Sequence, residues 1–117
     1  MVVCGVARAG VRGELATIRD VILEVAGRYG VEVERIILFG SRARGDSRED
    51  SDWDILIVTR GGVGGEVLDR FAGEVERKLV YMDVIPEVIV VDRETFEKYK
   101  KPAYVFYYAE REGIEIR

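Results

Sequence analysis

The stretch LFGSRARGDSREDSDWDILIV, from Leu38 to Val58, contains two apolar runs separated by a polar, highly charged segment. The first run ends at Gly40, and the second begins at Ile55, directly after Asp52-Trp53-Asp54. Carboxylates at the entrance of an apolar strand are costly to desolvate unless a cation or hydrogen-bond donors compensate their charge. The stretch therefore predicts two buried strands with a site that uses negative charge where the second strand begins.

Apolar periodicity on both sides of this stretch predicts alternating helices and strands. Spacing of i, i+3 and i+7 favours helices, and short continuous apolar runs favour buried strands. Helices are expected over residues 14–29 and about 66–79, and through residues 94–99 with Asp92 as N-cap; strands are expected over 35–39, 55–58 and 87–91, with a short final strand within 112–116. The order predicts an α/β (α+β) fold, with one small sheet flanked by helices in a single domain spanning residues 1–117.

The composition limits the chemistry that this chain can perform. There is no histidine among the 117 residues, so histidine bases, catalytic triads and His–zinc sites are excluded. The net charge is −4, and no basic arm is present to grip a duplex, which argues against templated synthesis on nucleic acid. No apolar run approaches the ~20 residues that cross a bilayer, and Cys4 is the single cysteine, so we expect a cytoplasmic protein.

The carboxylates around the second strand have the spacing of a metal site. Asp52 and Asp54 are two residues apart, so their side chains leave the strand entrance on the same face. Mg²⁺ suits such a pair because it prefers carboxylate oxygen, and two ions about 3.5–4 Å apart can clamp a phosphoryl displacement. A third carboxylate is expected from Glu87, at the head of the next apolar run, with Asp83 as its rival. These residues predict a site for two magnesium ions.

The residues after the first strand have the character of a phosphate site. Gly40 lets the backbone turn sharply and approach a ligand closely. Ser41 can cap a helix that begins at Arg42 and can donate its hydroxyl to a phosphate, while Arg42 and Arg44 supply positive charge. A phosphate cradle beside a metal cradle favours a nucleoside triphosphate with its magnesium as the ligand.

The motif resembles a known family. Gly40-Ser41, ten further residues and then Asp52-Trp53-Asp54 match the pattern GSx10DxD of the minimal nucleotidyltransferases, in the DNA polymerase β-like nucleotidyltransferase superfamily. The local form GSRARG followed by SDWDILIV is especially similar to the archaeal and bacterial members, and the ending from Glu112 to Ile116 resembles theirs. The resemblance implies a small mixed β-sheet with helices around it, in the palm-like nucleotidyltransferase fold.

The resemblance also implies a function and a site. It places the phosphate-binding turn on Gly40 and Ser41, two metal-binding aspartates on Asp52 and Asp54, and the third carboxylate on Glu87, where this chain has Glu instead of the usual Asp and Pro86 before it. The implied reaction is Mg²⁺-dependent transfer of a nucleoside monophosphate, commonly AMP from ATP, to a hydroxyl. The implied acceptor is a tyrosine of a HEPN-domain partner protein, to which the chain acts as antitoxin.

Several alternatives stay open at the level of the sequence. The chain could be a catalytically weak antitoxin that neutralises a HEPN-type toxin by contact, or a nucleotide sensor that binds without turnover. Arg42 and Arg44 could form a solvated face, Glu87 could be an exposed edge-strand residue, and Asp83 could be a turn residue. The aromatic residues between Tyr99 and Tyr108 favour core or partner packing over base stacking. The preferred base is not readable from the sequence, and a homo-oligomer is possible.

Overall fold

The computed structural model describes the backbone of residues 2–45, 47–48 and 51–117, and within these ranges the side chains from residue 13 onwards. Cys4 and residues 46 and 49–50 of the spacer between Ser41 and Asp52 therefore lie outside the described side chains. The elements in chain order are α1 (Val2–Tyr29), β1 (Val33–Phe39), α2 (Gly40–Arg44), β2 (Trp53–Thr59), α3 (Gly65–Tyr81), β3 (Pro86–Asp92), α4 (Arg93–Lys98), α5 (Val105–Glu112) and β4 (Ile114–Glu115).

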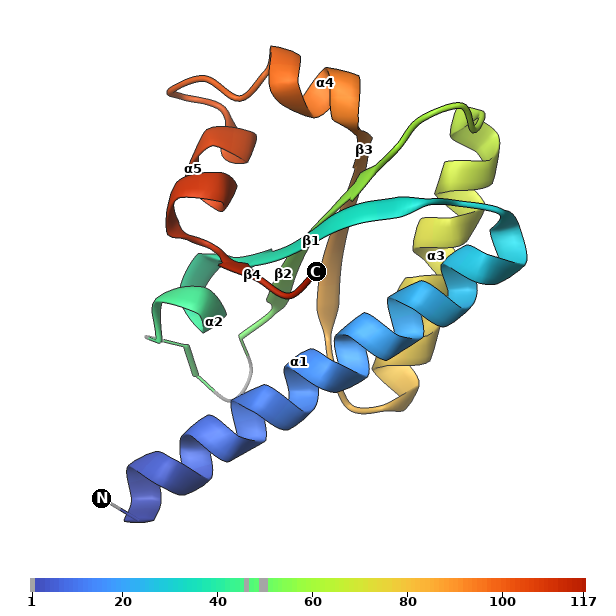
Figure 1. Cartoon of the computed structure of the whole chain (residues 1–117). Helices are drawn as coiled ribbons and strands as arrows, with labels where there is room; N and C mark the ends of the chain where they lie inside the picture. Colours follow the sequence, from blue (N-terminus) through green and yellow to red (C-terminus); the bar gives the residue numbers. More distant parts are fainter. Residues whose placement is uncertain (1, 46, 49–50) are drawn as a thin grey trace.

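The strands form one mixed sheet in the order β3-β2-β1-β4. β1 pairs antiparallel with both β2 and β4, whereas β2 and β3 run parallel and are joined through α3. A parallel pair needs such a long crossover because the chain must return to the end of the sheet at which the first strand began. The predicted small mixed sheet flanked by helices is confirmed (Figure 1).

The helices α1 and α3 cover one face of the sheet and enclose the main core (Figure 1). Their buried residues include Ile22 and Val25 from α1 and Phe71 and Val75 from α3. The sheet contributes alternate residues to this core: Ile36, Leu38, Trp53, Ile55 and Ile57. Alternation along a strand places every second side chain on one face, which explains why these residues share a core.

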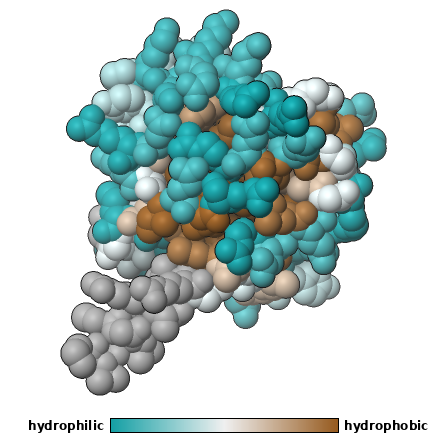
Figure 2. Space-filling view, in the orientation of Figure 1, coloured by the Kyte–Doolittle hydropathy of each residue, from teal (hydrophilic) through white to brown (hydrophobic). Residues whose placement is uncertain are grey.

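The opposite face carries a smaller core beneath α4 and α5. Ile37, Leu56, Val58 and Val91 from the sheet pack there with Phe96 and Ala109 from the two helices. In the space-filling view, apolar residues remain at the surface over the middle of the molecule, with polar residues around them (Figure 2). This second layer is built from two short helices, and the strand ends beside it hold the predicted site residues.

Several elements differ from the prediction. Helix α1 begins at Val2 instead of residue 14, because a glycine in a helix costs only about 1 kcal/mol and does not by itself stop the helix. Strand β1 begins at Val33, two residues before the predicted start. Helix α5 was not predicted at all. No helix of the described chain combines the length and apolar character needed to cross a bilayer.

Gly113 explains how α5 and β4 fit against the sheet. A Cβ at this position would collide with the carbonyl oxygen of Ala109 and with the side chain of Ile37, and would lie 2.8 Å from the carbonyl oxygen of Leu38. Arg35 on β1 fixes the same segment, since its guanidinium donates to both carboxylate oxygens of Glu115 at 2.7 and 2.8 Å. The C-terminal helix and strand are therefore attached tightly to the middle of β1.

Candidate active site

Gly40 is the residue on which the geometry of the site depends. It has a φ of 73°, in the left-handed region that glycine adopts without strain. A Cβ there would also collide with the Oδ2 atom of Asp54. The absence of a side chain thus serves both the backbone turn and the close approach of a carboxylate from the neighbouring strand β2. The prediction that Gly40 allows a sharp turn is confirmed, and its close approach to a ligand stays a prediction.

The helix after this turn begins earlier than predicted. α2 starts at Gly40 with Phe39 in the N-cap position, and no side chain caps it. The expectation that Ser41 caps a helix from Arg42 is therefore wrong, because glycine's left-handed φ lets the turn form directly at the end of β1. Ser41 lies in the first turn, where its carbonyl oxygen accepts from the N–H of Gly45 at 2.9 Å.

Asp54 and Glu87 are brought together by the pairing of β2 with β3. The two residues are direct partners in the parallel register. Each is followed two residues later by a member of the smaller core, Leu56 and Ile89, so both side chains lie on the α4–α5 side of the sheet. The register confirms that β2 and β3 are neighbours and pairs Asp54 with Glu87, whereas the convergence of all three carboxylates, Asp52 included, stays a prediction.

The electrostatics of Asp54 show that carboxylates crowd this corner. Burial raises its pKa above the ordinary value, and the negative charges of Glu87 and Asp52 raise it further. The positive charge of Arg44 acts in the opposite direction. A carboxyl group has a raised pKa when solvent and nearby positive charge stabilise its ionised form too little. A bound cation would supply that compensation.

Asp52 and Glu87 differ from Asp54 in being exposed. Asp52 lies just before β2. Glu87 is the second residue of β3 and follows Pro86, the partner of Trp53. Among the described residues, no three acidic, cysteine or histidine side chains are grouped closely enough to hold a metal ion. The donor set is nonetheless suited to Mg²⁺, because it consists of carboxylates, and two of the three side chains are exposed and can change rotamer.

Arg42 contacts both residues that flank Asp52. Its Nη2 and Nε atoms donate to the carbonyl oxygen of Ser51 at 2.9 and 3.3 Å. Its guanidinium carbon lies 4.5 Å from the centre of the ring of Trp53, a cation–π geometry. Trp53 itself is buried in the main core, on the face of the sheet opposite to Asp54. The sequence indicated a phosphate role for Arg42, and the ring contact was not anticipated.

Asp83, the rival for the third carboxylate, lies in a turn. It is exposed, has a φ of 62°, and occupies the turn after α3, where its N–H donates to the carbonyl oxygen of Val80 at 3.0 Å. Aspartate tolerates this left-handed conformation better than most residues. The turn interpretation of Asp83 is confirmed, which leaves Glu87 as the third carboxylate near Asp54.

The C-terminal aromatic residues divide between core and surface. Phe106 packs on Phe96 with ring centres 5.7 Å apart, whereas Tyr99, Tyr104 and Tyr108 are exposed. Helix α5, which carries Phe106 and Tyr108, also contacts α2. The aromatic segment thus supplies packing for the smaller core and borders the turn that begins at Gly40.

A mixed sheet that holds a glycine turn against paired strand-end carboxylates defines the architecture of a nucleotidyl-transferring enzyme. Residues 18–112 match the nucleotidyltransferase domain family, and this chain belongs to it. It is a minimal nucleotidyltransferase of the DNA polymerase β-like superfamily, as the motif GSx10DxD predicted.

Relatives of known sequence or structure agree with this assignment. A provisionally named protein adenylyltransferase of Methanocaldococcus jannaschii is 35% identical over 85 residues, which cover 73% of this chain and 80% of the relative. A provisionally named nucleotidyltransferase of Sulfolobus solfataricus superposes with a TM-score of 0.58 and 27% identity, over 93% of this chain and 84% of the other. A provisionally named minimal nucleotidyltransferase gives 0.55 and 27%, over 86% and 93%.

A more distant structure shares the fold. The match is to a toxin–antitoxin solved with AMP-PNP, with a TM-score of 0.52 and 18% sequence identity. It covers 84% of this chain and 71% of that one.

Proposed function

We propose that this chain transfers AMP from ATP to a hydroxyl group of a protein, with Mg²⁺ as cofactor. The observation that carries the proposal is the pairing of Asp54 with Glu87 beside the turn at Gly40, together with the raised pKa of Asp54. A pair of carboxylates beside a glycine turn suits a triphosphate and its metal better than an uncharged ligand. The name of the M. jannaschii relative supports a protein as the acceptor.

In this proposal each residue has a defined role. Asp52, Asp54 and Glu87 hold magnesium, which when bound neutralises the charge of the phosphates during transfer. Ser41 and the N–H groups of the turn donate to phosphate oxygens, and Arg44 adds positive charge. The acceptor oxygen attacks the α-phosphorus, the bond to the β-phosphate oxygen breaks, and pyrophosphate leaves. Glu87, exposed at the start of β3, takes the proton of the acceptor hydroxyl.

We further propose that the acceptor is a tyrosine of a HEPN-type toxin, so that the chain acts as an antitoxin. This step rests on the resemblance of GSRARG and SDWDILIV to the archaeal and bacterial members of the family, which often act as antitoxins beside a HEPN-domain protein. Neutralisation by contact is the second candidate function. It is favoured by one observation: in the portion of the chain that the structure describes, the three carboxylates are not gathered into a metal cluster.

The test is transfer of label from α-labelled ATP, with Mg²⁺, to the protein encoded next to this chain. GTP, CTP and UTP run in parallel to determine base preference. We expect label on the partner, its loss with Asp54→Asn, and no change with Glu112→Gln, a matched carboxylate-to-amide change on an exposed residue of α5. Absence of label from every nucleotide, with intact partner binding, would overturn transfer and leave the contact mechanism.

A further inference from the structure

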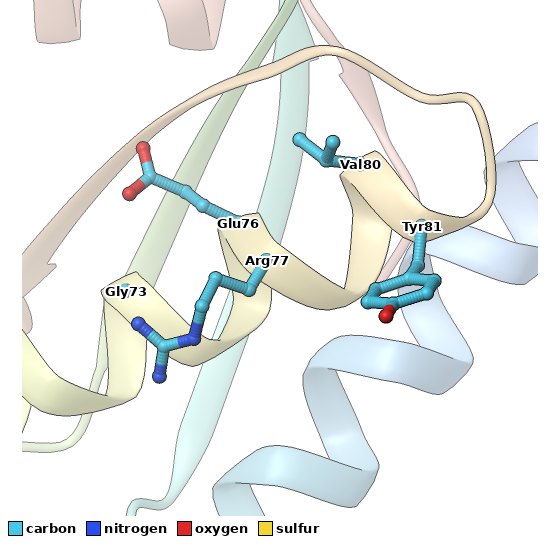
Figure 3. A pocket seen from close by; sticks show the side chains of 5 residues that line it. All are labelled: Gly73, Glu76, Arg77, Val80 and Tyr81. Atoms are coloured by element: carbon cyan, nitrogen blue, oxygen red, sulfur yellow. The ribbon is translucent and has the colours of Figure 1, made fainter.

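A second surface lies on the opposite side of the molecule from the carboxylates. Gly73, Glu76, Arg77, Val80 and Tyr81 line a shallow pocket of about 430 Å³ along α3 (Figure 3). Their spacing of three and four residues places them on one side of the helix, whereas Phe71, Val75 and Leu79 point into the main core. We call the five pocket residues the α3 stripe.

The end of this stripe carries unusually exposed apolar side chains. Tyr81 is 93% exposed and Val80 is 54% exposed, and Met82 and Ile85 beyond the helix are also more than half exposed. Single exposed apolar residues are common on protein surfaces, but four of them between residues 80 and 85, at one helix end, indicate a surface that binds a partner.

The charges of the stripe are also unsatisfied within the described part of the chain. Neighbouring charged residues of α3 form ion pairs: Glu74 with Arg28, Lys78 with Glu24 at 2.7 Å, and Arg70 with Glu66 at 3.7 Å. For Glu76 and Arg77, the described residues provide no ion pair. These two residues are adjacent in sequence, so they project in different directions and do not pair with each other.

The stripe is complementary to a second copy of itself. When two copies of α3 pack antiparallel about a twofold axis between residues 76 and 77, Glu76 of one faces Arg77 of the other, and the same pair forms again by symmetry. Val80 then faces Gly73, where a Cβ would lie 3.5 Å from Nη1 of Arg77, so the Arg77 side chain borders this contact (Figure 3). Beyond the stripe, Arg70 approaches Asp83. One register therefore places opposite charges across the axis, in the two Glu76–Arg77 pairs and in the approach of Arg70 to Asp83.

We propose that the α3 stripe binds a second copy of this chain in this antiparallel arrangement. The contact spans about 12 residues, or roughly 18 Å of helix. A contact of this length is small for a stable protein–protein interface, so the dimer is weak and its population depends on protein concentration. Because α3 covers the face opposite to the one that carries Asp54 and Glu87, both candidate active sites stay open in the dimer.

The test is sedimentation velocity of the whole chain from about 5 to about 500 µM, a range that detects weak dimers. Arg77→Glu or Glu76→Arg alone places like charges across the axis, and we expect about 10-fold weaker association for each. The double variant Glu76→Arg/Arg77→Glu restores opposite charges and should return dimerisation to that of the unmodified chain. Glu112→Arg, an equal change of charge on α5, should have no effect.

Two outcomes would overturn the proposal. One is an unmodified chain that stays monomeric over the whole range, which would assign the stripe to another partner or to solvent. The other is a dimer that neither single reversal weakens, or that both weaken without recovery in the double variant. Circular dichroism of each variant shows whether it is folded. Tyr81→Ser, which removes apolar surface without changing charge, should weaken the dimer in the same measurement.

Discussion

The two faces of the sheet use the same strands for opposite purposes. On the α1–α3 face, Trp53, Ile55 and Ile57 are fully packed against two long helices. On the other face, the first side chain of β2 is that of Asp54, a half-buried carboxylate whose pKa is raised by burial and by neighbouring negative charge. One face therefore supplies stability, whereas the other accepts an electrostatic cost at its edge in order to hold a site.

The largest expected effect comes from Asp54→Asn, which separates the two purposes directly. Loss of a metal-binding carboxylate should reduce transfer about 1000-fold or more, measured as turnover with labelled ATP. The same substitution should raise the free energy of unfolding. Because the folded protein raises the pKa of Asp54, the ionised carboxylate lowers the free energy of unfolding above that pKa, and this cost disappears as the pH falls below the unfolded value.

Asp54→Asn should therefore be more stable than the unmodified chain near pH 7.5, and the difference should shrink at acidic pH. Urea denaturation near pH 7.5 and at acidic pH measures this difference in the free energy of unfolding. Added Mg²⁺ should stabilise the unmodified chain and not the variant, since the cation binds only the folded state. A variant less stable at pH 7.5 would contradict the contrast between the two faces.

Gly113→Ala tests the attachment of the smaller layer. A methyl group there meets the carbonyl oxygen of Ala109 and the side chain of Ile37, and we expect a loss of about 1–3 kcal/mol of unfolding free energy. Gly27→Ala is the matched control. It lies exposed in α1 with no atom within 4 Å of a Cβ, so it should stabilise by about 0.5–1 kcal/mol. Equal effects would show that α5 and β4 are not tightly fitted.

Arg42→Met sharpens the comparison at the boundary between the faces. The guanidinium joins the Trp53 ring, in the main core, to the segment that carries Asp52. Its removal should lower activity by about 10–100-fold, as for residues that orient metal ligands. Weakened half-saturation by Mg²⁺ with little change in KM for ATP would indicate positioning of Asp52. A rise in KM for ATP alone would indicate direct phosphate binding instead.

Glu115→Gln is expected to give the smallest effect. The hydrogen bond from Arg35 holds the pKa of Glu115 below its ordinary value. The pair therefore stabilises the protein above the unfolded pKa of glutamate, and this contribution is lost as the pH falls through the folded value. Glu115 is partly exposed, so the loss at neutral pH should be well under about 1 kcal/mol by thermal denaturation. A difference that persists unchanged in acid would point to packing instead.

The residues themselves determined much of this protein. The runs Arg35–Phe39 and Ile55–Val58 predicted two central strands because continuous apolar residues of that length must be buried. The motif from Gly40 to Asp54 predicted the turn, the carboxylates and the family. These features are local: each depends on backbone preference or on side-chain alternation over a few neighbouring positions.

Other features were decided only by the tertiary structure. The register of β2 with β3 pairs Asp54 directly with Glu87, and no pattern within either strand encodes that alignment. Arg42 contacts Trp53, eleven positions along the chain, and Gly113 is required by Ile37 and Leu38, more than seventy positions earlier. The physical reason is the same in each case. Contacts between distant segments depend on how whole elements pack, whereas sequence patterns report the preferences of each element alone.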